Sequence, residues 1–342
     1  MYGTPIPRPK DAIVLRPHWR YLVKRDGTRR SRNCCDGSPC AAPSLHAFAM
    51  TYSSCVEQPI QCLFFALSAH MGYRVYGGDA QDAYAHSPPP EVPTFVSLDS
   101  QYIDWYEHKH NIKLDPSHVL PVQHALQGHP ESGRLWEAHI NKILTNIGFK
   151  NTVHDKCIYQ TTYRGTKILL LRQVDDFSIA SPSETLAKEI YNIIGTQLQL
   201  PDEKEPPFKY LGLLADFNGI DIIQSADRIT LSCSHYISRV LTTHGWSTPE
   251  QDTDTSNKPT SPIPADSIDA MYNTTGPGEG TKEHAKLADK SGFSYRSLLG
   301  ELMYAYVTCR PDIGYSVTTL SKFSTCPSPT HYQLLKGVAL YL

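Results

Sequence analysis

The sequence predicts an α+β fold, because segments with helical and with strand-like apolar patterns follow one another along its 342 residues. Apolar side chains recur at helical spacing over residues 58–71 and 132–144, which indicates one buried and one amphipathic helix. Over residues 167–180 two apolar runs flank a pair of acids, the pattern of a buried β-hairpin with carboxylates at its turn. A chain of this length can form two or three lobes with their own cores.

The remaining elements are expected from shorter patterns. A further helix is expected over residues 185–200, and the prolines at 88–90 exclude regular structure there. Residues 247–294 are rich in Pro, Thr, Asp, Gly and Lys, which predicts a linker or mobile insertion. Residues 295–342 return to a helical pattern that stops without a capping signal, as in a fragment. Short strands bounded by turn residues are expected over 21–23, 73–77, 208–214, 219–223 and 229–231.

The charge balance excludes a globally basic nucleic-acid binder. The net charge is −2 and the pI is near 6.7, while hydrophobic residues make up 40% of the chain, as in a globular protein. Residues 1–32, however, hold nine Lys and Arg against two Asp, a local balance of +7. This segment is either a phosphate-binding surface or a solvated arm.

The cysteines and the hydropathy pattern indicate an intracellular protein. Nine cysteines without regular pairing intervals suit a reducing compartment. Cys34, Cys35, Cys40 and His46 lie close in sequence but lack the two paired ligand blocks of a zinc finger, so zinc is a minor alternative. No stretch of 18 apolar residues occurs, and the first 30 residues are too charged for a signal peptide, so no membrane segment is expected.

Three aspartates are candidates for metal chemistry. Asp175 and Asp176 lie between apolar runs, and burying both without a partner would be unfavourable by several kcal/mol. A divalent cation such as Mg²⁺ would compensate them, although a solvated turn with two surface acids is also consistent. Asp79 follows a short strand, and if both strands share one sheet, three carboxylates can converge on two metal ions.

Five ordered sequence blocks resemble copia-type LTR retrotransposon reverse transcriptases, the polymerase domain of a pol polyprotein. GDAQDAYAHSPPP resembles polymerase motif A in its D-x-x-D-A-Y form, ALQGHPESGRLW resembles motif B, and QVDDF resembles motif C. FKYLGLLADFNGIDIIQ is similar to the primer-proximal segment. YRSLLGELMYAYVTCRPDIGYSVTTLSKF is similar to the stretch beyond the thumb, with its Tyr-Arg-Ser-Leu-x-Gly and Thr-x-Arg-Pro-Asp-Ile signatures.

The resemblance implies the catalytic residues. Asp79, Asp175 and Asp176 would hold two Mg²⁺ ions, for which Mn²⁺ can substitute. Tyr84 would be the steric gate whose ring excludes a ribose 2′-hydroxyl. Asp82 would hold local geometry or a nucleotide hydroxyl, with a purely structural role as the alternative.

The resemblance also implies binding residues. Gln127 and Gly128 would lie by the incoming nucleotide and template, where glycine permits close backbone approach. Arg30 and Arg32 would bind the triphosphate, with surface charge as the alternative, and Lys209 would face primer phosphate.

Two departures from the family pattern bear on primer and template handling. Gln173 stands where the family usually has Tyr. In motif B, His129-Pro130-Glu131-Ser132-Gly133 replaces the usual Lys-Gln-x-Pro sequence.

The implied architecture is a right-hand polymerase fold with fingers, a ferredoxin-like palm, a thumb and a C-terminal connection-like segment. The expected parts in chain order are fingers 1–72, palm 73–94, fingers 95–130, palm 131–217, thumb 218–246, a linker or mobile insertion 247–294, and a connection-like segment 295–342 truncated before a ribonuclease H domain.

The implied function is RNA-directed DNA synthesis from dNTPs on an RNA or DNA template with a primer, in the cytoplasm or within a virus-like particle. Contacts with phosphate would make binding sensitive to salt. Other domains of a pol polyprotein are expected as partners. Three alternatives stay open: a catalytically inert relic that only binds nucleic acid, a template-independent palm enzyme such as a nucleotide cyclase, and a structural assembly domain.

Overall fold

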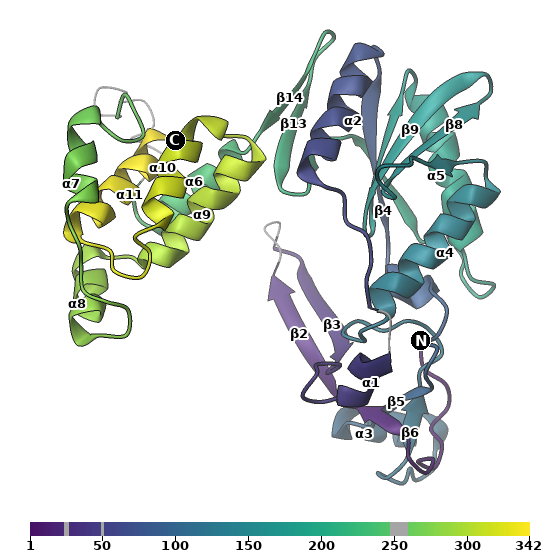
Figure 1. Cartoon of the computed structure of the whole chain (residues 1–342). Helices are drawn as coiled ribbons and strands as arrows, with labels where there is room; N and C mark the ends of the chain where they lie inside the picture. Colours follow the sequence, from purple (N-terminus) through teal and green to yellow (C-terminus); the bar gives the residue numbers. More distant parts are fainter. Residues whose placement is uncertain (24–26, 49–50, 247–258) are drawn as a thin grey trace. The chain divides into compact units, whose positions relative to one another are not determined.

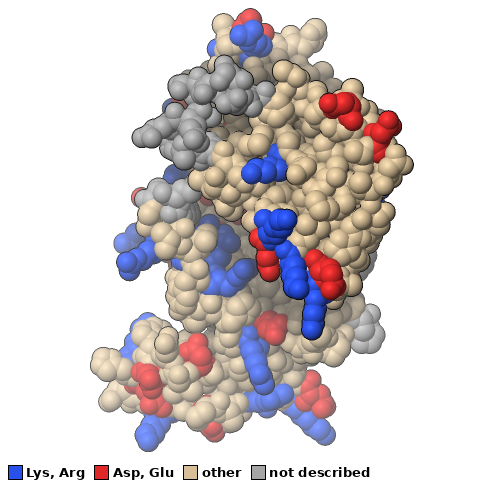
Figure 2. Space-filling model, turned by 90° about the vertical axis from the view of Figure 1, so that its left-hand side faces the viewer, with Lys and Arg blue, Asp and Glu red and all other residues tan. Residues whose placement is uncertain are grey.

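The computed structural model describes residues 1–23, 27–48, 51–246 and 259–342, which form two compact units, Met1–Leu214 and Ala215–Leu342 (Figure 1). Among the helices of these residues, none combines the length and apolar character that crossing a bilayer requires. Figure 2 shows a face on which uncharged residues predominate and several Lys and Arg side chains lie beside Asp or Glu. Basic and acidic groups therefore lie interspersed on this face, in line with the net charge of −2.

The first unit is built around one antiparallel sheet with the strand order β11-β4-β10-β9-β8-β7. Its longest strand, β9, pairs with β10 through the predicted hairpin over residues 167–180, which is confirmed. The strand bounds are β4 Arg74–Ala80, β7 Lys150–Asn151, β8 Ile158–Tyr163, β9 Thr166–Gln173, β10 Asp176–Ser181 and β11 Phe208–Leu213.

Helices cover the sheet and enclose the main core. Helices α4 (Ser132–Asn146) and α5 (Glu184–Leu198) contribute Trp136, Ile140 and Tyr191 to a cluster with Phe177 of the sheet. Helix α2 (Gln58–His70) packs against β4 and β9 from the opposite side (Figure 1). All three helices were predicted, since their apolar residues recur every three to four positions.

A smaller core holds the N-terminal strands of the same unit. β1 (Ile13–Leu15), β5 (Thr94–Ser97) and β6 (Val119–Pro121) form a three-stranded sheet beside α1 (Pro43–Phe48) and α3 (Ser100–His110). Leu15, Leu45, Val96 and Leu120 are buried together there.

A long hairpin joins this core to the basic segment of the sequence. β2 (Pro17–Val23) pairs with β3 (Arg29–Cys35), whereas only residues 21–23 were predicted as strand. The hairpin was underestimated because almost all its residues beyond the base are exposed on both faces, so the sequence shows no apolar alternation.

The second unit combines a small sheet with a helical bundle. The strands β12 (Asp216–Phe217), β13 (Ile220–Gln224) and β14 (Ile229–Ser232) form a meander. The predicted strands over 219–223 and 229–231 correspond to β13 and β14, whereas β12 was not predicted. The helices bury one apolar cluster and comprise α6 Ser234–Thr243, α7 Ile268–Tyr272, α8 Lys282–Ser291, α9 Tyr295–Thr308, α10 Gly314–Ser321 and α11 Pro329–Tyr341, with 3₁₀ turns η3 Ala265–Ser267 and η4 Pro311–Ile313.

The expected linker over residues 247–294 does not describe its C-terminal part. Residues 247–258 lie outside the described residues, but 259–294 contain η3, α7 and α8. The prediction was wrong there because one fully buried side chain, Met271, attaches the segment to the helical core. Its carbonyl oxygen also receives a hydrogen bond from the buried His331 ring at 2.7 Å. Ile263, Leu287 and Phe293 add to this cluster, but apolar residues this widely scattered leave no periodic signal.

We expect Met271→Ala to lower the free energy of unfolding of the second unit by about 2–5 kcal/mol, because a fully buried Met leaves a cavity. The neighbouring Tyr272→Ala is the matched control, since Tyr272 is exposed and its loss should have an effect of less than about 1 kcal/mol. Denaturant unfolding followed by circular dichroism measures both. Equal effects would mean that Met271 does not anchor this segment.

Candidate active site

Strand pairing brings the three predicted aspartates to one end of the main sheet. β4 and β10 are antiparallel neighbours, and their register places Asp176 opposite Asp79. The backbone carbonyl of Asp175 accepts a hydrogen bond from Ala80 at 2.9 Å, which ties the β9–β10 turn to the end of β4. Asp79 and Asp175 are half-buried and Asp176 is exposed. The conditional expectation that both strands share one sheet is confirmed.

The same strand ends bring Lys209 and Gln173 into line with these acids. Lys209 of β11 pairs with Asp79, and Gln173 of β9 pairs with Asp176. Side chains directly opposite one another in antiparallel strands project from the same face of a sheet. The row Lys209, Asp79, Asp176 and Gln173 therefore crosses four strands on one face.

These acids line a cleft of about 610 Å³ that also receives basic side chains. Lys209 enters it from β11, and Arg29 and Arg30 enter it from the β2–β3 hairpin. Its described wall carries four acids and three basic groups. The lining residues are Thr28, Arg29, Arg30, Asp79, Ala80, Gln81, Asp82, Asp175, Asp176, Lys209 and Leu211. Such a cleft has groups for both metal ions and phosphates.

The turn that carries Asp175 is strained and held from two sides. Val174 has φ +56°, which is a rare conformation for a β-branched residue. Trp136 of α4 donates its indole N–H to the Val174 carbonyl at 2.7 Å. On the other side, Gln173 accepts a hydrogen bond from the Val56 backbone N–H through Oε1 at 3.0 Å. Gln173 thus has a structural contact within the protein, which sequence reasoning did not anticipate.

Tyr84 lies on a 3₁₀ turn, η1 (Ala83–His86), directly after the end of β4. Its ring is half-buried against the main core. Burial raises the pKa of Tyr84, the negative charge of Asp175 raises it further, and the positive charge of Arg32 opposes this. These effects show that Tyr84 lies within electrostatic range of both predicted site residues.

Asp82 starts the same turn in a left-handed conformation, with φ +49° and ψ +41°. Its backbone carbonyl accepts a hydrogen bond from Ala85 at 2.7 Å, while its exposed side chain makes no capping hydrogen bond to the turn. The side chain lines the cleft, so both the structural role and the nucleotide role suggested for Asp82 remain consistent with its position.

Gln127 and Gly128 lie at the base of the β2–β3 hairpin and are not among the residues lining the cleft. Cys35 donates its backbone N–H to the Gln127 carbonyl at 2.8 Å, and the Cys34 thiol lies 3.7 Å from Gln127 Oε1. Gly128 has φ +91°, and a side chain on it would collide with the Cys35 carbonyl oxygen. Gly37 is equally restricted, because its side chain would collide with the Gly128 carbonyl oxygen.

The minor zinc alternative gains no support from these contacts. His46 Nε2 lies 2.7 Å from the Gly37 carbonyl oxygen, Cys34 contacts Gln127, and Cys40 is exposed. Across the described residues, no three or more His, Cys, Asp or Glu side chains are already gathered in a geometry that could hold a metal ion.

Comparison with known protein families identifies the family of the chain that carries this cleft. The family model described as "Reverse transcriptase (RNA-dependent DNA polymerase)" matches residues 4–255, which include all of the cleft. The chain belongs to this reverse transcriptase family. Its fold is accordingly the right-hand polymerase fold, as predicted from the sequence blocks.

Several relatives of this reverse transcriptase chain are transposon proteins. It is 28% identical over 265 residues to the putative transposon Ty5-1 protein YCL074W of Saccharomyces cerevisiae, covering 77% of this chain and 74% of that protein. It is 28% identical over 227 residues to the retrovirus-related Pol polyprotein from transposon RE1 of Arabidopsis thaliana, covering 66% of this chain but 14% of the polyprotein. The predicted kinship with copia-type Pol polyproteins is thereby confirmed.

Among solved structures, the chain is similar to a foamy viral protease-reverse transcriptase in complex with dsDNA. The sequence identity is 15% and the TM-score is 0.43, over 98% of this chain and 53% of that one.

We expect Gly128→Ala to destabilise the first unit by well over about 1–2 kcal/mol, the approximate effect of a left-handed backbone alone on a residue with a side chain. Gly165→Ala is the matched control, because Gly165 also has a positive φ, +74°, but open space around it. Denaturant unfolding measures the difference. If the two variants lose equal stability, the close approach of Gly128 to Cys35 is unimportant.

Proposed function

We propose that the chain is the polymerase portion of a retrotransposon reverse transcriptase, an RNA-directed DNA polymerase that uses two metal ions. The observation that carries this proposal is the pairing of Asp176 with Asp79 at the wall of a cleft that also contains Asp175. The reaction is attack of a primer 3′-hydroxyl on the α-phosphate of a dNTP, with pyrophosphate as the leaving group. Because the chain corresponds to 14% of the Arabidopsis polyprotein, further pol domains are proposed as partners.

The acids suit Mg²⁺, with Mn²⁺ as a substitute, because hard carboxylate oxygens are the ligands that these ions prefer. Asp79, Asp175 and Asp176 would hold the ions after side-chain rotation. Two ions bound there would lower the pKa of the 3′-hydroxyl and stabilise the charge of the pyrophosphate.

The basic residues of the cleft account for substrate charge. Arg30, with Arg29 beside it, would bind the triphosphate from the hairpin, and Lys209 would contact primer phosphate from β11. Arg32 lies within electrostatic range of Tyr84 and would assist them from the same hairpin. Tyr84 would exclude ribonucleotides by contact with the 2′-hydroxyl, and Gln127 with Gly128 would support the hairpin from its base.

The named parts of the hand follow as proposals. Residues 1–72 and 95–130 would be fingers, 73–94 and 131–217 palm, and 218–246 thumb. The helical residues after 258 would form the connection-like segment.

Template contact is proposed for the exposed face of the β2–β3 hairpin. Trp19 and Tyr21 are 46% and 75% exposed, and their rings are stacked with centroids 6.4 Å apart. Strand alternation places Val23 on the same face, opposite Arg29, which lines the cleft. Aromatic rings beside arginines bind single-stranded nucleic acid by base stacking and by phosphate contact.

We expect Asp175→Asn to reduce primer extension on an RNA template with Mg²⁺ by at least about 10²- to 10³-fold, the range seen when one transition-state-stabilising group is lost. Asp104→Asn, at an exposed position on α3, is the matched control and should stay active. Magnesium binding, measured by calorimetry, should weaken in Asp79→Asn.

The alternatives give different results in the same assays. Binding of a primer–template without extension by the unaltered protein would identify an inert relic. Product formation without added template would identify a template-independent palm enzyme. Magnesium binding that is unchanged in Asp79→Asn would favour an assembly domain.

We expect the double change Trp19→Ala with Tyr21→Ala to weaken binding of a primer–template with a long single-stranded 5′ overhang by about tenfold or more, since each stacked base contributes about 1–3 kcal/mol. Binding of a blunt duplex should change little. Trp105→Ala is the matched control, because Trp105 is 50% exposed in the same unit. Fluorescence anisotropy of labelled nucleic acid measures all three proteins. An equal loss with blunt duplex would contradict the stacking role.

A further inference from the structure

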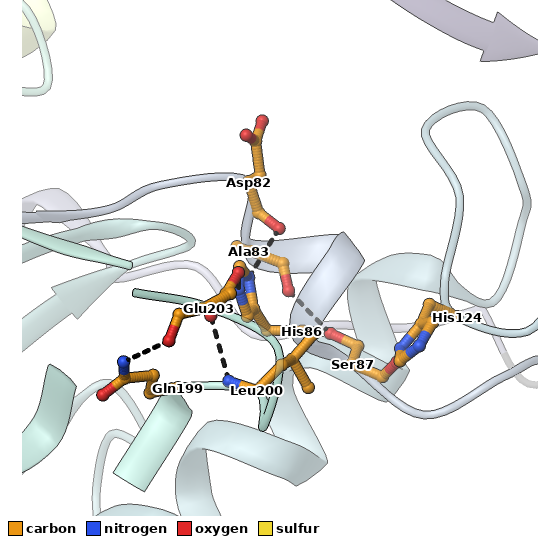
Figure 3. Close-up of polar contacts among 8 residues, drawn as sticks. All are labelled: Asp82, Ala83, His86, Ser87, His124, Gln199, Leu200 and Glu203. Atoms are coloured by element: carbon orange, nitrogen blue, oxygen red, sulfur yellow. Dashed lines mark hydrogen bonds and ion pairs between the residues drawn. The ribbon is translucent and has the colours of Figure 1, made fainter. Parts of the chain in front are cut away.

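His86 ends the turn that carries Tyr84, and its ring connects that turn to a distant loop. Figure 3 shows the ring between the Asp82 carbonyl and the side chain of Glu203. His86 Nδ1 lies 3.2 Å from the Asp82 carbonyl oxygen, and Nε2 lies 2.7 Å from Glu203 Oε1. The His86 side chain is 5% exposed and that of Glu203 is 31% exposed. Because His86 and Glu203 are 117 positions apart, their contact ties the Tyr84 turn to a distant loop.

The His86 ring is held at both of its nitrogens. Nδ1 and Nε2 each face an oxygen atom that can accept a hydrogen bond, a peptide carbonyl and a carboxylate. Of the two contacts, the one with the Glu203 carboxylate is the shorter. A ring that is almost fully buried and contacted at both nitrogens has little freedom to turn.

Other titratable groups lie around His86. The pKa values of His124, whose Nδ1 lies 3.1 Å from the Ser87 carbonyl oxygen, and of His139 of α4 are lowered mainly by burial. Burial raises the pKa of Glu203, but hydrogen bonds from the Leu200 N–H and from His86 lower it by more. The Glu203 carboxylate is therefore stabilised as a hydrogen-bond acceptor for the His86 ring.

Glu203 is itself fixed by its own loop, between α5 and β11. The Leu200 N–H donates to Glu203 Oε2 at 2.9 Å, and the Glu203 N–H donates to the Leu200 carbonyl at 3.0 Å. The Gln199 side chain donates to the Glu203 carbonyl at 2.9 Å. The same loop leads into β11, where Pro207 accepts a hydrogen bond from Gln81 at 2.9 Å. Because these contacts fix the Glu203 carboxylate, it can restrain the His86 ring that it contacts.

We infer that the His86–Glu203 ion pair positions the Tyr84 ring and so determines how well the site rejects ribonucleotides. The turn between the pair and β4 consists of Asp82 in its left-handed conformation followed by η1, with Tyr84 inside it. Ring placement within a fraction of an ångström decides whether a 2′-hydroxyl fits, so a loosened turn admits it. This inference rests on the proposed function, and His86 and Glu203 are positioning residues in it.

The experiment compares Glu203→Ala and Glu203→Gln with a matched pair elsewhere in the chain. His244 and Glu301 of the second unit lie 2.8 Å apart with side-chain exposures of 13% and 32%, close to those of His86 and Glu203. Glu301→Ala therefore removes a similar ion pair that does not contact the Tyr84 turn. The readouts are the ratio of kcat/KM for dATP to that for ATP in primer extension, and the melting temperature.

We expect Glu203→Ala to lower the dATP/ATP ratio by about tenfold, with the Glu203→Gln ratio between it and the unaltered protein. Glu301→Ala should lose melting temperature but keep its ratio. In a Tyr84→Val background, Glu203→Ala should change the ratio no further, because the ring through which it acts is gone. A ratio unchanged in Glu203→Ala, or an effect that persists without Tyr84, overturns the inference.

A second readout does not depend on catalysis. The ¹⁵N resonances of the His86 ring in the full chain should shift in Glu203→Ala, because Nε2 loses its partner, and should stay unchanged in Glu301→Ala. Extension that is absent in the unaltered protein refutes the proposed polymerase, whereas His86 resonances that are unchanged in Glu203→Ala refute the His86–Glu203 contact.

Discussion

The antiparallel pairing of β4 with β10 is the constraint on which the site depends. It places Asp79 opposite Asp176, although nothing in the local sequence of either strand requires them to meet. Like charges on adjacent strands repel, and the effect is larger near a protein surface than in water. The sheet offsets this repulsion with apolar residues at other positions of the two strands, among them Tyr76 and Ile179 in the main core. The apolar core therefore stabilises the sheet, while the ends of its strands carry the acidic groups of the site.

The two sides of this arrangement are held by different kinds of contact. On one side, the strained Val174 is secured by the Trp136 indole and Gln173 is secured by the Val56 backbone. On the other, the turn bearing Tyr84 ends in a buried histidine paired with Glu203. Strained or left-handed residues persist only where surrounding contacts determine their conformation, and both turns at this cleft satisfy that condition.

An element could be predicted from the sequence where its own residues show a periodic apolar pattern, and a contact between distant residues could not. The hairpin over 167–180 and the helix over 132–144 were predicted because burial on one side gives regular periodicity. The exposed β2–β3 hairpin and the helices over residues 259–294 were largely missed, since neither has such a pattern, whereas the helical pattern over 295–342 was predicted. Asp79, Asp175 and Asp176 were candidates from their positions beside apolar runs, and the resemblance then implied their role as metal ligands. The contact of Gln173 with Val56 could not be predicted, because it joins residues 117 positions apart.

The position of Gly128 changes how the second sequence block can be understood. Glycine was expected beside nucleotide and template, yet its nearest restriction is the backbone of Cys35 at the base of the hairpin. The other end of that hairpin delivers Arg29 and Arg30 to the acidic cleft. Close packing of Gly37 against Gly128 therefore fixes the base of the hairpin whose far end lines the cleft. Under the proposed function, residues remote from the cleft wall would thus help to place the cations that bind phosphate, because a chain of net charge −2 must attract phosphate with local groups.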